Sequence, residues 1–372
     1  MKIAHVDTGR EWRGGQAQVA LLLEGLRERG HEVMLAAPDA PLSQRARERG
    51  IEWLELRTGG DLDLGAGGRL ARRLEAWRPE LLHAHTARAH TVSRSAGRRL
   101  GVPVIVSRRV ITPVARNPFS RRKYRSGIAR YLCISRAVMD VLREGGVEAK
   151  RLALVPSAVD CERLAQVRAS VNAGQDRVSL RNLIGAAEHD TVFGTAGSVT
   201  RDKGVDEFAA AAAMVLARYP NMWAVWIGEG RDRARLERIA SGLGIGARLR
   251  VLGFRADAHA CIAQLDVFVS ASQHEGLGTA ILEAQALGVP VIATDSRGVR
   301  DSIEDGVNGR LVSNPRALGV SLGDALGDRA TLDGWRDKAL RSVREFSPRT
   351  MLVLTLAEYM KVRAEASTTA GD

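Results

Sequence analysis

The sequence predicts an α/β protein built from two consecutive doubly wound, Rossmann-like domains. Two observations support this prediction: apolar strand patterns alternate with amphipathic helix patterns, and the alternation starts again near Thr191. Strands that alternate with helices favour parallel sheets, because each parallel connection needs a long crossover that a helix provides. The 372 residues are enough for two domains that each bury a core.

The first half of the chain supplies the elements of the first domain. Strands are expected over residues 2–7, 32–37, 81–85, 102–107 and 131–135. Helices are expected over residues 16–29, 70–77 and 136–144. Ser135 is expected to cap the last of these helices, because a serine hydroxyl can accept a hydrogen bond from an amide of the first turn.

The second half repeats the pattern. Strands are expected over residues 192–197, 223–227, 249–252, 266–271 and 290–294, and helices over 205–218, 232–241, 257–263 and 348–364. Residues 164–187 are polar and poorly patterned, which is typical of a surface excursion. A hinge is expected near residues 155–160, so the first domain is predicted at 1–160 and the second at 161–345.

Positive charge is concentrated in one segment of the chain. From Leu81 to Met139 there is no Asp or Glu but there are thirteen Lys and Arg, and the whole chain has a net charge of +12. Such a one-sided segment favours an anionic partner, which could be a membrane lipid, a phosphorylated glycan or a nucleic acid. The alternative is a solvated basic surface that only aids solubility.

The sequence shows no pattern typical of export or of membrane insertion. Residues 1–7 are typical of a strand rather than of a signal peptide, and the apolar run 208–217 is too short to span a bilayer. Cys133, Cys161 and Cys261 lie far apart, so neither a disulfide framework nor a zinc site is indicated. A cytoplasmic protein is expected.

Glu275 and Glu283 are the most informative residues of the chain. Glu275 lies on a glycine-flanked loop after the expected strand 266–271, and Glu283 lies in the first turns of the helix that ends before Gly288. Open α/β sheets bind their ligands at this carboxyl edge of the strands. Ionised carboxylates accept hydrogen bonds, so the pair suits a hydroxyl-rich ligand such as a sugar or a ribose.

Three further motifs follow expected strands. Gly14 and Gly15 open the first helix, where backbone amides can face an anion or a sugar nucleotide. Lys203 precedes another helix, so that its ammonium and the helix amino terminus can face one anion. His83 and His85 share one face of a strand and could form half of a metal site, but the sequence shows no third ligand.

The segment from Phe268 to Val312 resembles the retaining glycosyltransferases of family four, whose GT-B fold has two Rossmann-like domains facing an interdomain cleft. The resemblance rests on the spaced glutamates within Glu-Gly-Leu…Leu-Glu-Ala…Leu-Gly-Val-Pro-Val-Ile-Ala, and it extends over nearly the whole chain. It implies that residues 1–160 form an acceptor-side domain and residues 161–345 a nucleotide-sugar-binding domain. It also implies that the helix 348–364 crosses back onto the first domain.

The resemblance implies that Lys203 holds the diphosphate of the donor. Family members carry an arginine directly after the first glycine of this loop, but the sequence has Ser198 there. Arg201 is therefore expected to reach the same phosphates from within the loop. No acidic metal site is apparent beside these residues, so the cations are expected to replace a divalent metal, and no cofactor is expected.

The remaining roles follow from the same resemblance. Glu283 is expected to bind the ribose, and Glu275 is expected to hold hydroxyls of the donor sugar. His85 is expected to contact the donor sugar from the first domain, whereas His83 is interpreted as structural. The other residues expected to line the donor site are Gly14, Gly15, Gly228, Phe254, Gly276, Leu277, Gly278 and Thr279.

Together with the resemblance, these expectations predict a retaining, metal-independent glycosyltransferase that moves a sugar from a nucleotide-sugar donor to an acceptor hydroxyl. The acceptor is expected to be an anionic or lipid-linked glycan of the lipopolysaccharide type, and residues 81–139 are expected to contact an anionic membrane peripherally. The alternatives are another GT-B enzyme, such as a sugar epimerase or a soluble-metabolite glycosyltransferase, and a non-catalytic nucleic-acid-binding protein. Nucleic acid is not the expected partner, because the basic segment has few aromatic residues on which bases could stack.

Overall fold

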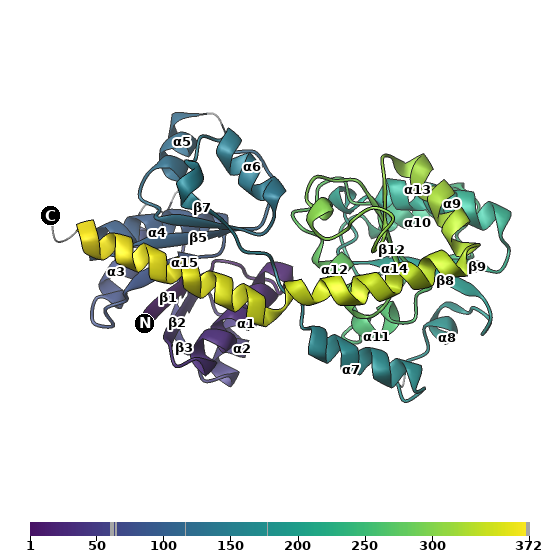
Figure 1. Cartoon of the computed structure of the whole chain (residues 1–372), viewed down its shortest axis with the longest axis horizontal. Helices are drawn as coiled ribbons and strands as arrows, with labels where there is room; N and C mark the ends of the chain where they lie inside the picture. The colour runs from purple at the N-terminus through teal and green to yellow at the C-terminus, as the bar shows by residue number, and fades with distance from the viewer. Residues whose placement is uncertain (60–62, 64, 116, 177, 370–372) are drawn as a thin grey trace. The chain divides into compact units, whose positions relative to one another are not determined.

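The chain folds into two compact units, each with a parallel sheet and covering helices (Figure 1). One unit comprises Met1–Ala158 together with the segment from Pro348 onward, and the other comprises Val159–Ser347. The structure is a computed structural model that describes residues 1–59, 63, 65–115, 117–176 and 178–369. None of the helices in these ranges is both long enough and apolar enough to cross a membrane.

The first unit has a seven-stranded sheet in the order β3-β2-β1-β4-β5-β6-β7, and all neighbouring strands are parallel. Its strands are β1 Lys2–Val6, β2 Glu32–Ala37, β3 Glu52–Glu55, β4 Leu81–Ala84, β5 Val104–Arg108, β6 Arg130–Cys133 and β7 Leu152–Leu154. Its α-helices are α1 Gly14–Glu28, α2 Pro41–Glu48, α3 Ala66–Leu74, α4 Ala87–Leu100, α5 Pro118–Arg125, α6 Arg136–Glu144 and α15 Pro348–Thr369.

The second unit has a six-stranded sheet in the order β10-β9-β8-β11-β12-β13, again with parallel neighbours. Its strands are β8 Thr191–Ala196, β9 Met222–Ile227, β10 Leu249–Val251, β11 Val267–Ser270, β12 Val291–Thr294 and β13 Arg310–Val312. Its α-helices are α7 Cys161–Asn172, α8 Leu180–Ile184, α9 Val205–Arg218, α10 Arg233–Gly242, α11 Ala258–Ile262, α12 Thr279–Ala286, α13 Pro315–Leu326 and α14 Arg329–Ser342.

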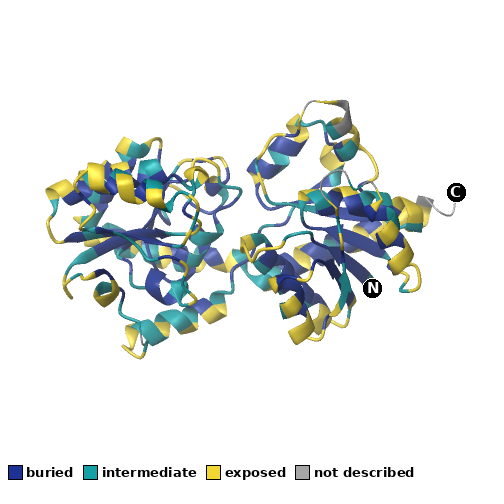
Figure 2. Cartoon of the chain, turned by 180° about the vertical axis from the view of Figure 1, so that it is seen from behind, coloured by how far each residue is buried: buried dark blue, intermediate teal, exposed yellow. Residues whose placement is uncertain are grey.

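Each sheet lies at the centre of its unit and is buried on both faces. Figure 2 shows buried strands between helices whose outer surfaces are exposed. This is the burial expected of parallel sheets, whose crossover helices cover both faces. The two sheets therefore confirm the predicted α/β class with two doubly wound, Rossmann-like folds.

The final helix, α15, packs on the first unit. Leu352 and Leu356 join the apolar core that α1 forms with the sheet, and Tyr359 is fully buried. The Tyr359 hydroxyl lies 2.5 Å from Nδ1 of His83, while Nε2 of His83 lies 2.9 Å from Oγ of Ser107. His83 thus has hydrogen-bond partners on both ring nitrogens and holds α15 against the sheet.

Residues 164–187, expected as a poorly patterned surface excursion, lie mostly at the surface but are largely helical. This part of the chain contains most of α7 and all of α8, Leu180–Ile184. Asp160 caps α7 by accepting a hydrogen bond from the amide of Arg163 at 3.0 Å. Among the residues of α7 only Leu164 is buried, so the helix has almost no apolar stripe that a sequence pattern could reveal.

The predicted cap at Ser135 is confirmed, since its hydroxyl accepts a hydrogen bond from the amide of Val138 at 3.2 Å. Several expected strands and helices also agree with the structure within a few residues, and the helices at 136–144 and 205–218 match at both ends. The helices α2, α4, α13 and α14 were not predicted, nor were short elements such as α5 and β7.

Gly204 sets the position of the turn between β8 and α9. Its φ angle is +77°, and a Cβ atom placed there would overlap the carbonyl oxygen of Ala271. Ala271 directly follows β11, which is the neighbour of β8 in the sheet. A glycine is therefore required both by the left-handed backbone and by the close approach of two loops.

We predict that Gly204→Ala destabilises the protein by at least ~2 kcal/mol more than Gly244→Ala, because overpacking against backbone adds to the strain of a positive φ. Gly244 is a matched control, since it has a φ of +71° and open space around its Cβ position. Chemical denaturation of both variants would measure the difference. If both variants lost the same free energy of unfolding, the loops that carry Gly204 and Ala271 would separate easily, and their close approach would not be constrained.

Candidate active site

Both sheets have a topological switch point, where the strand order reverses direction. In the first sheet the switch lies between β1 and β4, and in the second it lies between β8 and β11. Open α/β sheets bind their ligands at the carboxyl ends of the strands that flank such a switch point. Most candidate residues from the sequence follow the strands at these two places, whereas Gly228 and Phe254 follow β9 and β10.

At the second switch point, Lys203 and Glu275 form an ion pair. Lys203 ends a short 3-10 turn, Arg201–Lys203, after β8, and Glu275 lies between β11 and α12. The Lys203 Nζ atom donates a hydrogen bond to Oε1 of Glu275 at 2.5 Å, with side-chain exposures of 34% and 15%. Because an ammonium has three donors, Lys203 can hold Glu275 and still bind a second anion.

Glu283 lies on α12 and is linked to two further side chains. Its Oε2 atom lies 3.6 Å from Nε2 of His259, and Nδ1 of His259 accepts a hydrogen bond from Arg163 at 3.1 Å. A guanidinium can only donate, so Nδ1 of His259 carries no proton and Nε2 does. The Nε2 proton therefore faces the Glu283 carboxylate and orients it.

The loop between β11 and α12 can present backbone groups to a ligand. Gly276 and Thr279 are partly exposed, whereas the Leu277 side chain is buried and anchors the loop. Gly278 has a φ of +80° and precedes α12, whose first turn contains no acidic residue and receives no side-chain cap from Gly278. The amides of this turn thus resemble an anion site at a helix amino terminus.

Other residues expected at the donor site differ in exposure. Arg201 is exposed, and no carboxylate of the described residues lies within ion-pair distance of it. Ser198 is also exposed, at the start of the same loop. Gly228 follows β9 and packs so closely on Gly197 that a Cβ atom would overlap its carbonyl oxygen. Phe254 has an 84% exposed side chain, which is unusual for a large aromatic residue.

At the first switch point, three histidines meet. His5 on β1 lies beside His83 on β4, and His85 follows directly after β4. His5 Nδ1 and His85 Nε2 are 2.9 Å apart. Burial lowers the pKa of His5 to about 3 and lowers the pKa of His85 and His83 well below its ordinary value. All three rings are therefore neutral at physiological pH.

The sequence showed no third metal ligand beside His83 and His85, and this interpretation is wrong, because His5 brings a third imidazole within 4.8 Å. The arrangement nevertheless fits a metal poorly. Both ring nitrogens of His83 already have hydrogen-bond partners, and His5 and His85 are hydrogen-bonded to each other. A cation would also lie near the guanidinium of Arg109, whose charge depresses the pKa of all three histidines.

Arg109 is the second residue at this switch point that the sequence did not single out. It follows β5, and its Nη1 donates to the backbone carbonyl of His85 at 3.3 Å while its Nη2 donates to His85 Nδ1 at 3.4 Å. Burial lowers the pKa of Arg109 to about 10, partly opposed by the nearby carboxylate of Asp7. The guanidinium therefore stays charged near neutral pH.

Asp7, directly after β1, is buried and is held by the amides of Gly9 and Gln16. Burial raises the pKa of its carboxyl group above the ordinary value, although both hydrogen bonds oppose this shift. Gly14 and Gly15 begin α1, whose first turn also lacks an acidic side chain. The first switch point thus combines one cation, one buried carboxyl group and a helix amino terminus.

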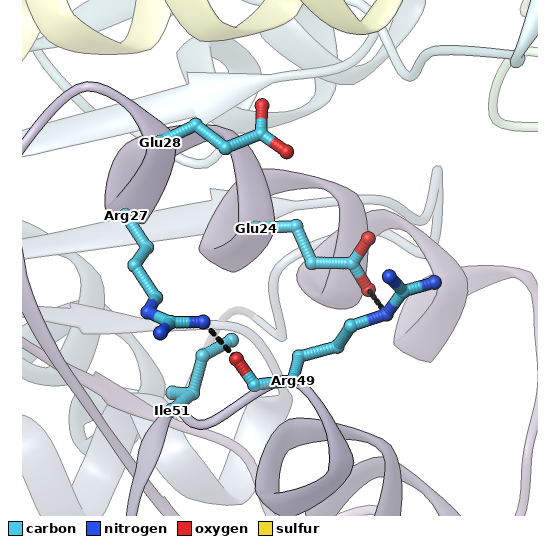
Figure 3. A pocket seen from close by; sticks show the side chains of 5 residues that line it. All are labelled: Glu24, Arg27, Glu28, Arg49 and Ile51. Atoms are coloured by element: carbon cyan, nitrogen blue, oxygen red, sulfur yellow. Dashed lines mark hydrogen bonds and ion pairs between the residues drawn. The ribbon is translucent and has the colours of Figure 1, made fainter.

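A separate pocket of about 350 Å³ lies on the other half of α1 (Figure 3). Glu24 on α1 forms an ion pair with Arg49, and Arg27 on the same helix donates a hydrogen bond to the Arg49 carbonyl. The residues that line the pocket come from the carboxyl-terminal half of α1 and from the segment before β3. This half of α1 is at the opposite end from Gly14 and Gly15, so the pocket is not part of the candidate site.

Five residues of the two sites were missed from the sequence: His5, Asp7, Arg109, Arg163 and His259. His5 could be recognised only from the pairing of β1 with β4, which places it opposite His83. The basic segment includes Arg109, but its pattern does not distinguish one arginine from another. His259 comes from the short helix α11 and has no sequence signal of its own.

Comparison with known proteins identifies the family. A family model described as glycosyl transferases group 1 matches residues 176–339, and one described as Glycosyltransferase Family 4 matches residues 12–163. The lipopolysaccharide core biosynthesis glycosyltransferase LpsE of Rhizobium meliloti is 39% identical over 112 residues, which are 30% of this chain and 31% of LpsE. The chain thus matches about a third of the length of that relative.

Two longer similarities cover most of the chain. A GDP-mannose-dependent alpha-mannosyltransferase of Mycobacterium tuberculosis is 28% identical over 321 residues, which are 80% of both proteins. The crystal structure of HepE from Anabaena in complex with UDP-glucose has a TM-score of 0.80 and 20% identity, and covers 97% of this chain and 99% of HepE. Its fold is that of the two sheets described above. The chain therefore belongs to the family 4 glycosyltransferases and has the GT-B fold.

Proposed function

We propose that this glycosyltransferase moves a sugar from a nucleotide-sugar donor to an acceptor hydroxyl with retention of anomeric configuration. One observation carries the proposal: the Lys203–Glu275 ion pair lies at the switch point of the second sheet, on loops next to the helix that bears Glu283. This arrangement offers a cation and two carboxylates at one edge of a sheet. A nucleotide-sugar contains the complementary groups, namely a diphosphate, a ribose and a sugar.

Lys203 would stabilise the leaving diphosphate. Negative charge develops on the phosphate oxygens as the glycosidic bond breaks, and a cation that is already in place stabilises it without reorganisation. The ammonium uses one donor for Glu275, and the remaining two can bind phosphate oxygens. The amides at Gly278 and Thr279 and the exposed Arg201 would contribute further positive charge, so that no metal is needed.

The two carboxylates would bind different parts of the donor. Glu283, oriented by His259, would accept hydrogen bonds from the ribose hydroxyls. Glu275 would accept hydrogen bonds from the donor sugar, and its bond to Lys203 would fix the sugar relative to the breaking bond. Gly228 and Phe254 would border the base. They follow β9 and β10, whose carboxyl ends lie at the same edge of the sheet as that of β8.

The first unit would bind the acceptor, with His85 and the loop at Gly14 and Gly15 on the substrate side. The basic segment suits a phosphorylated or lipid-linked glycan, and residues 81–139 would contact an anionic membrane peripherally from the cytoplasm. LpsE, a lipopolysaccharide core glycosyltransferase by name, supports an acceptor of that class. HepE was crystallised with UDP-glucose, which supports a UDP-sugar as one donor to test.

We predict that Lys203→Ala lowers kcat by ~100-fold or more and changes donor affinity less, because the ammonium meets charge that develops in the transition state. Arg201→Ala is expected to have the smaller effect, since Arg201 is exposed and lies outside the ion pair. Release of nucleoside diphosphate from a panel of nucleotide-sugars would measure both. A control variant is Lys150→Ala, which changes an exposed lysine outside both sites.

Near-normal turnover of Lys203→Ala would refute the phosphate role, and a larger effect of Arg201→Ala would reverse the two assignments. The same assay run with excess chelator tests metal independence. Activity that is lost on chelation and restored by magnesium would contradict it.

We predict that Glu283→Ala mainly raises the KM for the donor, whereas Glu275→Ala also lowers kcat. Contacts to the ribose act in the ground state and the transition state alike, but contacts to the reacting sugar need not. Steady-state kinetics with the donor varied would separate the two parameters. A folded Glu283→Ala variant with unchanged donor KM would exclude the ribose role.

We predict that replacing Arg121, Arg122, Lys123 and Arg125 by Ser weakens binding to anionic vesicles, because each basic residue near such a surface contributes about 1 kcal/mol. Sedimentation with anionic and neutral vesicles at two salt concentrations would measure it. Replacing the exposed arginines of the second unit, Arg231, Arg238, Arg329 and Arg341, is the matched control. Equal binding of wild type to both vesicle types would leave the segment as a solubilising surface.

The main alternative is a non-catalytic nucleic-acid-binding protein that uses the same basic segment. Tight, salt-sensitive binding to nucleic acid without sugar transfer from any donor would favour it. Membership of family 4 and the pair Glu275 and Glu283 both favour the transferase. Nucleic-acid binding would explain neither the family match nor two carboxylates in the site. A sugar epimerase would release a changed sugar without forming a glycoside, so product analysis distinguishes it.

A further inference from the structure

Arg109 is a half-buried cation that has no carboxylate partner among the described residues. Its guanidinium donates hydrogen bonds to two uncharged acceptors, the carbonyl oxygen and Nδ1 of His85. Asp7 is close enough to influence Arg109 electrostatically, but it lies outside ion-pair distance and is held by Gly9 and Gln16 instead. Partial burial of a charge without a counter-ion is unfavourable, so the site is preformed for an anion.

The histidines beside Arg109 have a defined pattern of protons. Because Arg109 only donates, Nδ1 of His85 is unprotonated, and the proton of this neutral ring is on Nε2. Nε2 of His85 therefore donates to Nδ1 of His5, and the proton of His5 is on its own Nε2, which is buried without a partner in the described part of the chain. Both ring nitrogens of His85 are thus occupied.

This pattern changes which residue can reach a substrate. His85 is only 6% exposed and has no ring nitrogen left, whereas Arg109 is partly exposed and uses two of its five donors. Arg109 therefore has three N–H groups available. The Nε proton and one terminal proton of a guanidinium form a fork that matches two oxygens of a carboxylate or a phosphate.

We propose that Arg109, held in place by His85, binds an anionic oxygen group, a phosphate or a carboxylate, on the sugar substrate at the carboxyl edge of the first sheet. The inference rests on the proposed function and names the chemical class of its substrate. It assigns substrate contact to Arg109 and makes His85 a positioning residue that acts through Arg109.

The surrounding charges support an anion at this place. Arg88 at the start of α4 and Arg108 at the end of β5 lie on the same sheet edge, and Lys123 on α5 donates a hydrogen bond to the carbonyl of Ala87 beside it. The segment that bears all of them contains no acidic residue. Asp7, a buried carboxyl group nearby, is held by hydrogen bonds from Gly9 and Gln16 and lies outside ion-pair distance of Arg109.

The anionic group could belong to the acceptor or to the donor sugar. An acceptor that carries a phosphate or a uronic acid offers it in one case, and a nucleotide-linked uronic acid offers it in the other. The diphosphate of the donor is not a candidate, because the proposed function places it at Lys203 in the second unit.

The first test measures binding without a donor. Full-length protein with ¹⁵N-labelled histidine is titrated with glucose 6-phosphate, glucuronate and methyl glucoside, and the His85 ring signals are followed. We expect an unprotonated Nδ1 in His85 and at least ~10-fold tighter binding of the two anions than of methyl glucoside, the range for hydrogen bonds to charged groups. Arg109→Gln should reduce this preference to about 2-fold or less.

Two variants control for charge and for folding. Arg108→Gln removes one charge from the same turn, but Arg108 donates to Tyr124 at 3.0 Å instead of to His85, so the preference should persist. Arg109→Lys keeps the charge and loses the fork, so an intermediate preference is expected. Because the readout is a ratio of affinities within one variant, partial unfolding does not imitate the expected result.

The second test identifies the source of the anion. The kcat/KM values for neutral and anionic acceptors, and for UDP-glucose and UDP-glucuronate, are compared in wild type and Arg109→Gln. The anionic group belongs to the substrate, acceptor or donor, for which Arg109→Gln no longer prefers the anionic form over the neutral form. An unchanged anion preference in Arg109→Gln, no preference in wild type, or a protonated Nδ1 in His85 would overturn the proposal. Failure of transfer with intact anion binding would instead refute the proposed function alone.

Discussion

The site in the second unit depends on the close approach of two backbone segments. Gly204 lies against the carbonyl of Ala271, so the loops after β8 and β11 are held together where the strand order reverses. This approach places Lys203 and Glu275 within 2.5 Å of each other, although 71 residues separate them in the chain. A rigid sheet thus fixes the distance between a cation and a carboxylate, which is the geometry that electrostatic catalysis requires.

The two switch points differ in how their charged groups are arranged. In the second unit, opposite charges meet at the surface and remain partly exposed, so a ligand can exchange with one of them. In the first unit, burial keeps three histidines neutral, and the charged Arg109 donates its hydrogen bonds to one of them, His85. Under the proposed function, the ion pair in the second unit suits a donor whose charge changes during the reaction, whereas Arg109 in the first unit suits recognition of a fixed anionic group.

The helix α15 connects the end of the chain to the first site. Its Tyr359 bonds to His83, and the ring of His83 lies 4.1 Å, centroid to centroid, from that of His85. A disturbance of α15 therefore reaches the ring that orients Arg109 through only two side chains. The packing of this helix is part of the geometry of the site as well as of the stability of the first unit.

The sequence by itself determined the fold class and singled out Lys203, Glu275 and Glu283 as candidate residues of the second site. Alternating apolar patterns are local, and the glutamate pair and Lys203 lie in short motifs next to buried strands, so both could be recognised without coordinates. The amphipathic pattern failed for α7, because only Leu164 of that helix is buried. Local patterns report which residues face a core, and α7 has almost no such face.

Only the tertiary structure decided which distant residues act together. His5 meets His83 and His85 because β1 pairs with β4, and Arg109 reaches His85 because β5 follows β4 in the sheet. Likewise, His259 reaches Glu283 only through the packing of α11 and α7 in the second unit. Strand order and helix packing depend on contacts between residues far apart in the chain, and no local spacing encodes them. The proton positions on the histidines follow from these contacts, so they too were set by the fold.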